Sequence, residues 1–217
     1  DPTKANDQDI WWIKKQTKLL KLATENGSAY VYDLEKIIES ATSLMSLSSV
    51  DNIFYAMKAN SNSEILRALE GEGINFECVS PGEIHRLLEL FPDIDRKRLL
   101  FTPNFAPRSE YQWGLDQGTW VTLDNLHPLR YWPKIFKNRE IFIRIDTGEG
   151  QGHHEHVRTA GTYSKFGIPL QEIEEMGDLL KRAGARVVGL HAHTGSGILQ
   201  ADNWRMVGER LLALQGN

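Results

Sequence analysis

The stretch IFIRID, residues 141–146, belongs to the series of short runs that decides the fold. Each run is rich in β-branched and aromatic residues, as β-strands are. The runs IFYAM, FECVS, LLFTP, WVTLD and IFIRID begin at residues 53, 76, 99, 120 and 141, which are 23, 23, 21 and 21 residues apart. A sixth run, VVGLHAH, begins 46 residues later, at residue 187. Strands that recur at this spacing predict βα units and therefore a parallel sheet.

Stretches with helical spacing of apolar residues lie between the runs. They cover residues 62–73, 81–91 and 170–184. In the last stretch the apolar residues form one stripe of a helix, which Gly184 ends. Before the first run we expect a helix at 11–23, a short strand at Tyr30–Tyr32 and a helix at 34–47.

Two α/β architectures compete for this pattern, the doubly wound open sheet and the (β/α)₈ barrel. No GxGxxG follows the first strand, which weakens the dinucleotide-binding form of the open sheet. Polar residues gather at the carboxyl ends of the runs, where barrels carry their active sites. These residues are Lys58, Asn60, Glu77, Ser80, Asn104, Asp124, Asn125, Arg144, Asp146, His191, His193 and Ser196. The sequence therefore favours a TIM-like (β/α)₈ barrel.

The pattern supplies about six of the eight units that such a barrel needs. We expect residues 1–25 to form an N-terminal helical segment and residues 26–217 to form the barrel, truncated at its C-terminal end. The chain begins without Met, which suggests a processed chain or a piece cut from a longer protein. Two strands without partners would then form exposed edges.

Composition excludes several classes of function. The chain of 217 residues has a formal net charge of −4 and no Lys/Arg-rich run, which argues against binding of nucleic acids or anionic membranes. No apolar stretch approaches the ~18 residues that a membrane span needs. The single cysteine, Cys78, cannot form an intrachain disulfide, and the polar N-terminus lacks the layout of a secretory signal. A cytoplasmic location is the simplest expectation.

Lys58 ends the first run, NIFYAMKAN, which is otherwise mostly apolar. A lysine at this place either reaches solvent, as most lysines do, or stands at the mouth of the barrel. A partly buried lysine has a lowered pKa and can act as an imine-forming nucleophile. The run alone leaves both interpretations open.

The sixth run carries a stronger signal in the sequence GLHAHTGSG, residues 189–197. His191 and His193 alternate with apolar residues, so both imidazoles lie on one face of the strand. The Thr-Gly-Ser-Gly turn that follows suits a phosphate, because no Cβ blocks the glycine backbone. The alternative is a structural hydrogen-bond network and a tight turn. The cluster HHEH at 153–156 lacks an HExxH arrangement or a cysteine partner, so we predict no metal site there.

The motifs YAMKAN, FECVSPGE, IRID, HHEHVRTAG followed by SKFG, and GLHAHTGSG occur here in one order. In that order and spacing the chain resembles the fold-type III pyridoxal-phosphate decarboxylases, whose barrel is of the alanine racemase type, and among them the diaminopimelate decarboxylases. The resemblance covers the chain from about Trp11 onward. The segments ECVSPGE and LLFTPNFAPR look most like the decarboxylase half of bifunctional aspartate kinase/diaminopimelate decarboxylases.

The resemblance implies a role for individual residues. Lys58 would hold pyridoxal 5′-phosphate covalently, and His193 would stack on its ring. Ser196 and Gly197 would contact the phosphate, and Arg144 would lie near the phenolic oxygen. Glu77 matches an acidic position of the family that is more often Asp. Lys165 of SKFG would be an interface residue.

The resemblance also implies an amino-acid substrate, decarboxylation of meso-diaminopimelate to lysine, and a homodimer with shared active sites. In the family, further groups that bind the phosphate, the pyridine nitrogen and the substrate lie beyond the sixth barrel unit. We therefore expect residues 1–217 alone to be inactive. Two alternatives stay open: an ornithine- or arginine-type decarboxylase, and a non-catalytic barrel that binds pyridoxal phosphate.

Overall fold

The computed structural model describes residues 10–148, 165–195 and 198–214. The chain divides into two compact units, which are described separately. One unit contains residues 1–53 and 60–74, and the other contains residues 54–59 and 75–217. The predicted domain boundary at residue 25 stays a prediction. In the described part of the chain, no helix is both long enough and apolar enough to cross a membrane.

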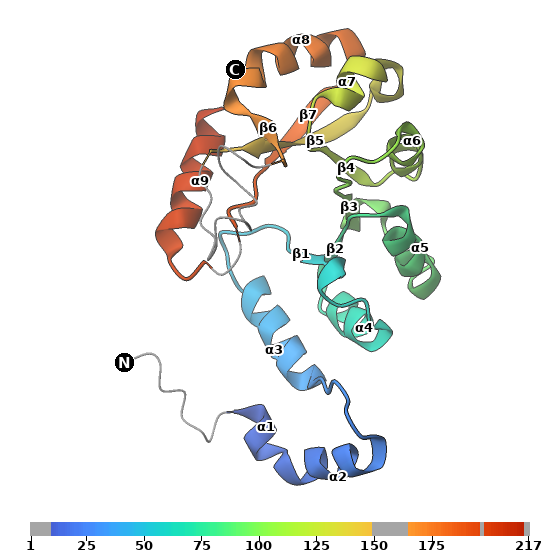
Figure 1. The fold of residues 1–217 in the computed structure, drawn as a ribbon, viewed down its shortest axis with the longest axis vertical. Coiled ribbons are helices and arrows are strands. Elements are labelled where there is room, and N and C mark those ends of the chain that lie inside the picture. Colours follow the sequence, from blue (N-terminus) through green and yellow to red (C-terminus); the bar gives the residue numbers. More distant parts are fainter. Residues whose placement is uncertain (1–9, 149–164, 196–197, 215–217) are drawn as a thin grey trace. The chain divides into compact units, whose positions relative to one another are not determined.

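The described part of the first unit is helical (Figure 1). Its helices are α1 (Trp11–Lys14), α2 (Gln16–Asn26), α3 (Leu34–Met45) and α4 (Ser63–Gly71). The helix predicted at 11–23 is therefore broken at Lys15, which ends α1 and precedes α2. The strand predicted at Tyr30–Tyr32 is wrong, because these residues belong to no strand in the structure. Their side chains are exposed, so the β-branched and aromatic pattern there marks no buried strand.

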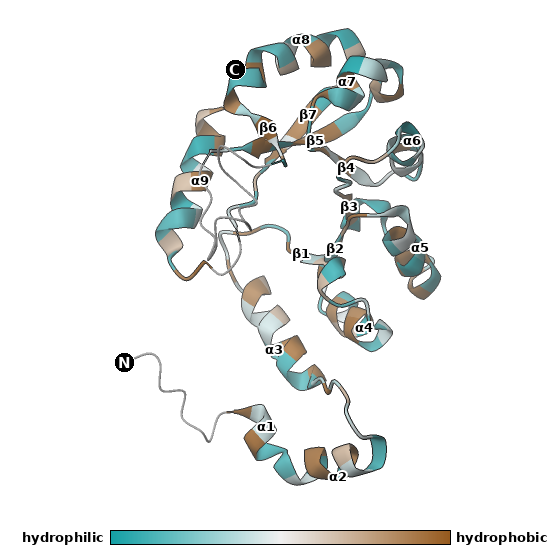
Figure 2. Cartoon of the chain, in the orientation of Figure 1, coloured by the Kyte–Doolittle hydropathy of each residue, from teal (hydrophilic) through white to brown (hydrophobic). Residues whose placement is uncertain are grey.

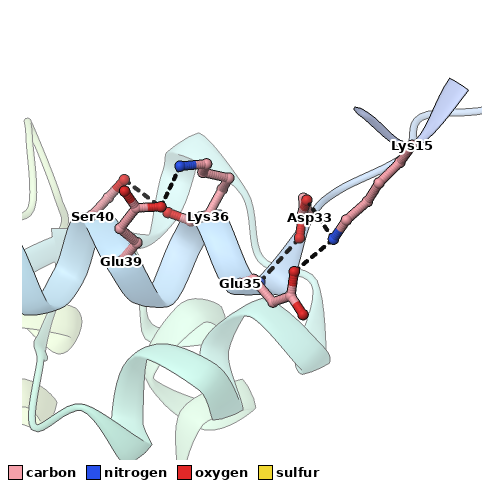
Figure 3. Close-up of polar contacts among 6 residues, drawn as sticks. All are labelled: Lys15, Asp33, Glu35, Lys36, Glu39 and Ser40. Carbon is pink, nitrogen blue, oxygen red and sulfur yellow. Dashed lines mark hydrogen bonds and ion pairs between the residues drawn. The ribbon is translucent and has the colours of Figure 1, made fainter. Parts of the chain in front are cut away.

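Lys15 and the start of α3 are joined by an ion-pair cluster (Figure 3). The Lys15 Nζ lies 2.9 Å from Asp33 Oδ2 and 2.7 Å from Glu35 Oε2. Asp33 also caps α3, because its Oδ1 accepts a hydrogen bond from the Glu35 backbone N–H at 3.1 Å. The hydrogen bond from Lys15 holds the pKa of Asp33 below its ordinary value. The break at Lys15 thus coincides with a contact to the next helix.

The second unit contains a parallel sheet with helices between most of its strands. Its strands are β1 (Phe54–Ala56), β2 (Asn75–Cys78), β3 (Leu99–Phe101), β4 (Trp120–Leu123), β5 (Glu140–Asp146), β6 (Ile168–Pro169) and β7 (Arg186–His191). Its helices are α5 (Pro81–Leu90), α6 (Arg108–Asp116), α7 (His127–Tyr131), α8 (Ile173–Ala183) and α9 (Ala201–Ala213). All six predicted runs form strands, and only β6 was not predicted. Gly184 ends α8 in the left-handed conformation, with φ of 66°, as predicted.

The strands pair in sequence order from β1 to β5, and every pairing is parallel. β5 then pairs with both β6 and β7. Helices α5, α6 and α8 lie outside the arc that the strands form (Figure 1). The sheet is not closed within the described residues, since β1 pairs only with β2 and β7 only with β5. This is the predicted barrel architecture, in the form of an open series of βα units.

The two faces of the sheet have different chemistry. On β5, Ile141, Ile143 and Ile145 are buried and alternate with partly exposed residues. Hydrophobic and hydrophilic residues are interleaved along the strands and helices (Figure 2). The buried face of the sheet is turned toward the helices. Phe101 of β3 and Val121 of β4 lie opposite one another on this face, and a Cβ added at Gly114 of α6 would meet both side chains. The opposite, inner face of β5 carries Phe142, Arg144 and Asp146. Alternation along one strand therefore separates the core from the polar inner face.

The pairing of β5 with β7 contains a register shift. Ile141 lies opposite Val187, but the next residue, Phe142, lies opposite Gly189. The extra residue, Val188, has the effect of a β-bulge. Without it Arg144 would lie opposite Leu190. With it Arg144 lies opposite His191, and His191 is turned to the inner face. A shift by one residue exchanges the two faces of a strand, so this bulge decides which side chains of β7 face inward.

The Phe142 ring occupies the space that a side chain at Gly189 would need. The ring also packs edge-to-face against Trp120, with centroids 5.4 Å apart. We predict that Gly189→Val destabilises the fold by about 1–3 kcal/mol, the usual cost of overpacking. Urea unfolding of the purified protein measures this cost.

The control is Gly208→Ala in α9, where the added Cβ would meet no neighbouring atom within 4 Å outside the helix's own backbone. A glycine-to-alanine change inside an open helix should be neutral or stabilising. Equal destabilisation by both variants would contradict the close packing of the Phe142 ring against Gly189.

Candidate active site

Strand register brings polar side chains together on the inner face, at the carboxyl ends of the strands. Ala56 lies opposite Glu77, and Arg144 lies opposite His191. Leu123 lies opposite Ile143, so the next residue on each strand, Asp124 and Arg144, are also neighbours. Asp124, Arg144 and His191 thus form a row across β4, β5 and β7. The sequence placed all three residues at strand ends but gave no role to Asp124.

Lys58 lies in a 3-10 turn, Met57–Ala59, that directly follows β1. Its neighbour Met57 is fully buried, which fixes the turn in the core. Of the two interpretations that the run left open, the Lys58 side chain follows the first, since it is exposed within the described residues. The lysine is therefore at the predicted strand end, with its amine accessible to a ligand.

Glu77 is held by a residue that sequence reasoning missed. The Thr102 hydroxyl donates a hydrogen bond to Glu77 Oε1, and the Thr102 backbone N–H donates to the Cys78 carbonyl at 2.8 Å. Thr102 follows β3 directly and is 7% exposed. The signal was its place in LLFTP, at the end of a predicted strand. Thr102 therefore orients the Glu77 carboxylate at the inner face.

Arg144 is partly buried, and its guanidinium lies over the Phe166 ring, 4.9 Å from the centroid. Burial lowers the pKa of Arg144, while the nearby carboxylates of Asp124, Asp146 and Glu77 oppose that shift. An arginine titrates so far above neutral pH that the guanidinium stays charged. Within the described residues its nitrogens donate to no acceptor. Five N–H donors in a fixed fork suit an anionic oxygen.

Burial favours the neutral form of both histidines. It lowers the pKa of His191 to about 4, and Arg144, His193 and Lys58 nearby act in the same direction. Burial also lowers the pKa of His193, again with help from Arg144 and Lys58. A neutral imidazole can lie against a flat ligand ring without adding charge. His191 Nδ1 is buried and has no partner among the described residues.

The sheet curves (Figure 1), and Lys58 acts electrostatically on His193. Lys58 follows β1, which begins the pairing path, and His193 follows β7, which pairs with β5. Five strand spacings of about 4.8 Å would place these two strands roughly 24 Å apart in a flat sheet. Their interaction therefore requires the arc that Figure 1 shows. The curvature brings Lys58, Arg144 and His193 around one space.

One of the predicted strand-end residues, Ser80, has a structural role instead. Ser80 caps α5, since its Oγ accepts from the Glu83 N–H at 3.3 Å. Glu83 Oε2 accepts in turn from the N–H of Val79, which precedes the cap, at 2.7 Å. Cys78 is fully buried, and burial raises the pKa of its thiol, so the side chain is not a nucleophile. Lys165 is exposed.

Ser196 and Gly197, and the histidines at 153–156, lie outside the described residues. The adjoining Thr194 is 4% exposed, and its Oγ1 is buried without a partner within the described part of the chain. Gly195 has φ of 119°, a conformation that side chains rarely adopt. Unpartnered polar atoms at Thr194 and His191, with an accessible lysine and a charged arginine, fit an anionic ligand with a carbonyl group. Pyridoxal phosphate has this chemistry, because an amine can attach its aldehyde and donors can bind its phosphate.

Comparisons with known proteins agree with this chemistry. Residues 34–214 match the family model of the pyridoxal-dependent decarboxylases, pyridoxal binding domain. A diaminopimelate decarboxylase from Methanothermobacter thermautotrophicus is 36% identical over 203 residues, which cover 91% of this chain and 47% of that protein. The chain thus spans about half the length of the curated relatives that it matches.

Some solved structures with the same fold are diaminopimelate decarboxylases, and others are arginine or lysine decarboxylases. One diaminopimelate decarboxylase has a TM-score of 0.79 and 26% identity, over 93% of this chain and 48% of the other. A second, from Helicobacter pylori and complexed with L-lysine, has a TM-score of 0.74 and 26% identity, over 90% of this chain and 53% of the other. Both matches confirm the predicted barrel architecture.

The lowered pKa of His191 predicts a dependence of stability on pH. An unfolded histidine titrates near 6.5, so between pH 6.5 and about 4 the unfolded chain binds a proton that the folded chain does not. The contribution of His191 to stability is therefore present above pH 6.5. It falls by about 1.4 kcal/mol per pH unit below that value.

The measurement is the free energy of unfolding of the wild type and of His191→Gln, in urea, at pH 7 and pH 5. Relative to the wild type, His191→Gln should gain about 1–2 kcal/mol on going from pH 7 to pH 5. An equal difference between the two proteins at both pH values would show that His191 titrates normally in the fold.

Proposed function

Because the chain belongs to the pyridoxal-dependent decarboxylase family, we propose that it is the barrel part of an enzyme that decarboxylates meso-diaminopimelate to L-lysine. The observation that carries this proposal is the convergence of Lys58, Arg144 and His193 on one inner face. The names of the relatives support the substrate, and the Helicobacter pylori relative was solved with L-lysine, the proposed product. We propose that these residues act within a longer, cytoplasmic protein that forms a homodimer.

Pyridoxal phosphate, when bound, supplies the electron sink for loss of the carboxyl group. We propose that Lys58 attaches it and, when an incoming amine displaces Lys58, handles protons. The neutral imidazole of His193 would lie against the ring and fix its tilt. A fixed ring holds the breaking bond in the orientation that the reaction requires.

Other residues of the inner face would bind and orient. Arg144 would donate to an anionic oxygen of the ligand from its place over Phe166. Glu77, which Thr102 holds, would face the same space with an acceptor carboxylate. Ser196 and Gly197 would contact the phosphate, next to the unpartnered hydroxyl of Thr194. None of these roles needs a metal ion.

The attachment to Lys58 can be tested in the complete protein. We predict that borohydride reduction fixes a pyridoxyl group on the peptide that contains Lys58, and that Lys58→Ala loses this label together with activity. Peptide mass mapping locates the label. Lys165→Ala is the control. It removes an exposed lysine that takes no part in the attachment, so this variant should be labelled at Lys58 as strongly as the wild type. A pyridoxyl group on another lysine would refute the assignment.

Activity of the unreduced, cofactor-loaded protein then separates decarboxylation from mere binding. Release of CO2 from meso-diaminopimelate, ornithine and arginine is compared under the same conditions. Preference for meso-diaminopimelate is expected. Preference for ornithine or arginine would contradict the substrate. A protein that takes the label on reduction but, when not reduced, turns over none of the three would be a non-catalytic binder.

The two histidines should differ in their effect on turnover. We predict that His193→Ala lowers kcat by about 10²-fold or more, because an orienting group is lost. His191→Ala should have a much smaller effect, since His191 belongs to the strand and lies beside Arg144. Steady-state kinetics on the loaded enzymes measures both. An equal loss, or a larger loss in His191→Ala, would show that the wrong histidine was chosen.

A further inference from the structure

Asp124 is a buried carboxyl group at the inner face that the proposed chemistry does not use. It directly follows β4 and is 2% exposed. Its Oδ1 accepts a hydrogen bond from Asn125 Nδ2 at 2.8 Å, while its Oδ2 is buried and has no partner among the described residues. A buried acceptor without a partner costs about 1–3 kcal/mol. The buried carboxyl group of Asp124 therefore lowers the stability of the fold. This cost suggests that the group has a function.

Hydrogen bonds that lead to the start of α7 fix the position of Asp124. Asn125, which donates to Asp124, accepts a hydrogen bond in turn from the His127 N–H at 2.9 Å. Leu123 and Leu126, on either side, are buried in the core. The carboxyl group thus has little freedom to move toward another partner.

Arg144 is the cation that Asp124 faces. The two residues are neighbours across the β4–β5 pairing, and each acts electrostatically on the other. Burial raises the pKa of Asp124, against the Asn125 hydrogen bond and the charge of Arg144. The Arg144 guanidinium also lies over the Phe166 ring. A long, rotamer-rich side chain thus has both a fixed carboxyl group and an aromatic ring as neighbours.

We propose that Asp124 is a positioning residue, which acts through Arg144 by holding its guanidinium ready for an anionic oxygen of the bound ligand. A guanidinium that is ordered beforehand binds without a further loss of side-chain entropy. This inference rests on the proposed function, because it takes pyridoxal phosphate as the ligand. Asp124 itself need not touch that ligand.

The sign of one measurement separates this role from a simple charge effect. Pyridoxal phosphate is an anion, so removing a carboxylate that merely repels it would tighten binding. Removing a carboxylate that positions Arg144 would weaken binding. In the complete protein we expect Asp124→Asn to raise the Kd for pyridoxal phosphate about tenfold, as measured by the absorbance of the bound form.

A double-mutant comparison shows whether the effect passes through Arg144. Arg144→Gln should weaken binding by a similar factor, and Asp124→Asn should cause no further weakening in that background. The control is Asp116→Asn, which removes a carboxylate from the exposed ion pair with Arg139, 2.6 Å long, and should leave Kd unchanged. Tighter binding in Asp124→Asn, or the same weakening with and without Arg144, would overturn the proposal.

A second measurement needs no cofactor. Phenylglyoxal modifies accessible arginines, and peptide mass mapping gives the rate for each site. In the cofactor-free protein we expect Asp124→Asn to raise the rate at Arg144 about threefold, while the rate at Arg139 stays constant. An unchanged rate at Arg144 would overturn the proposal. If the wild type forms no Lys58 adduct, the proposed function fails, and this measurement still decides the role of Asp124.

Weaker binding supports the proposal only if the variant is still folded. Thermal unfolding checks each protein before binding is measured. If Asp124→Asn does not fold, Asp124→Glu replaces it, since it keeps the charge but displaces the carboxyl group by one methylene. About threefold weaker binding, dependent on Arg144, is then expected. Unchanged Kd in Asp124→Glu, with an unchanged labelling rate at Arg144, would refute positioning.

Discussion

The register of β7 against β5 is the constraint on which the inner face depends. One extra residue, Val188, places Phe142 opposite Gly189 and Arg144 opposite His191. The glycine is required because the Phe142 ring occupies the space beside it. Without the shift the histidines would face the helix layer, where β5 carries isoleucines. A polar imidazole buried there without a partner would be costly. A packing contact between an aromatic ring and a glycine thus determines where the chemistry of β7 lies.

Charge on the inner face is arranged so that neither histidine needs to be protonated. The cations Lys58 and Arg144 lower the pKa of both imidazoles, and burial contributes more than either. The carboxylates of Glu77, Asp124 and Asp146 offset the charge of Arg144. Burying a single arginine at a strand end would be unfavourable, but three nearby carboxylates reduce that cost. The same carboxylates leave the guanidinium without a direct hydrogen bond among the described residues, so its donors can serve a ligand.

Much of the fold could be predicted from sequence because strand and helix periods are local properties. The six runs with β-branched and aromatic residues all formed strands, and Gly184 ended its helix as expected. The prediction failed at Tyr30–Tyr32, where a strand-like pattern has no strand partner, and at Lys15, where a tertiary ion pair accompanies a break in the helix. The roles of Thr102 and Asp124 depend on neighbours across strands, about 20 or more residues away. Spacing within one run does not contain that information. The roles given to Lys58, Glu77, Arg144, His193, Ser196 and Gly197 stay predictions.

Curvature explains how distant runs come to form one site. Lys58 follows β1, the first strand of the pairing path, and His193 follows β7, which pairs with β5, yet the two side chains interact electrostatically. A flat sheet would hold them far apart, so the polar groups become a site only when the sheet bends. Bending also brings Lys58 and Arg144 near the two imidazoles. If the histidines were protonated, their positive charges would repel those of Lys58 and Arg144 and so oppose the bend. Neutral histidines remove that repulsion. Burial contributes most to the low pKa of His191, and the charged groups that the curved sheet brings near it act in the same direction.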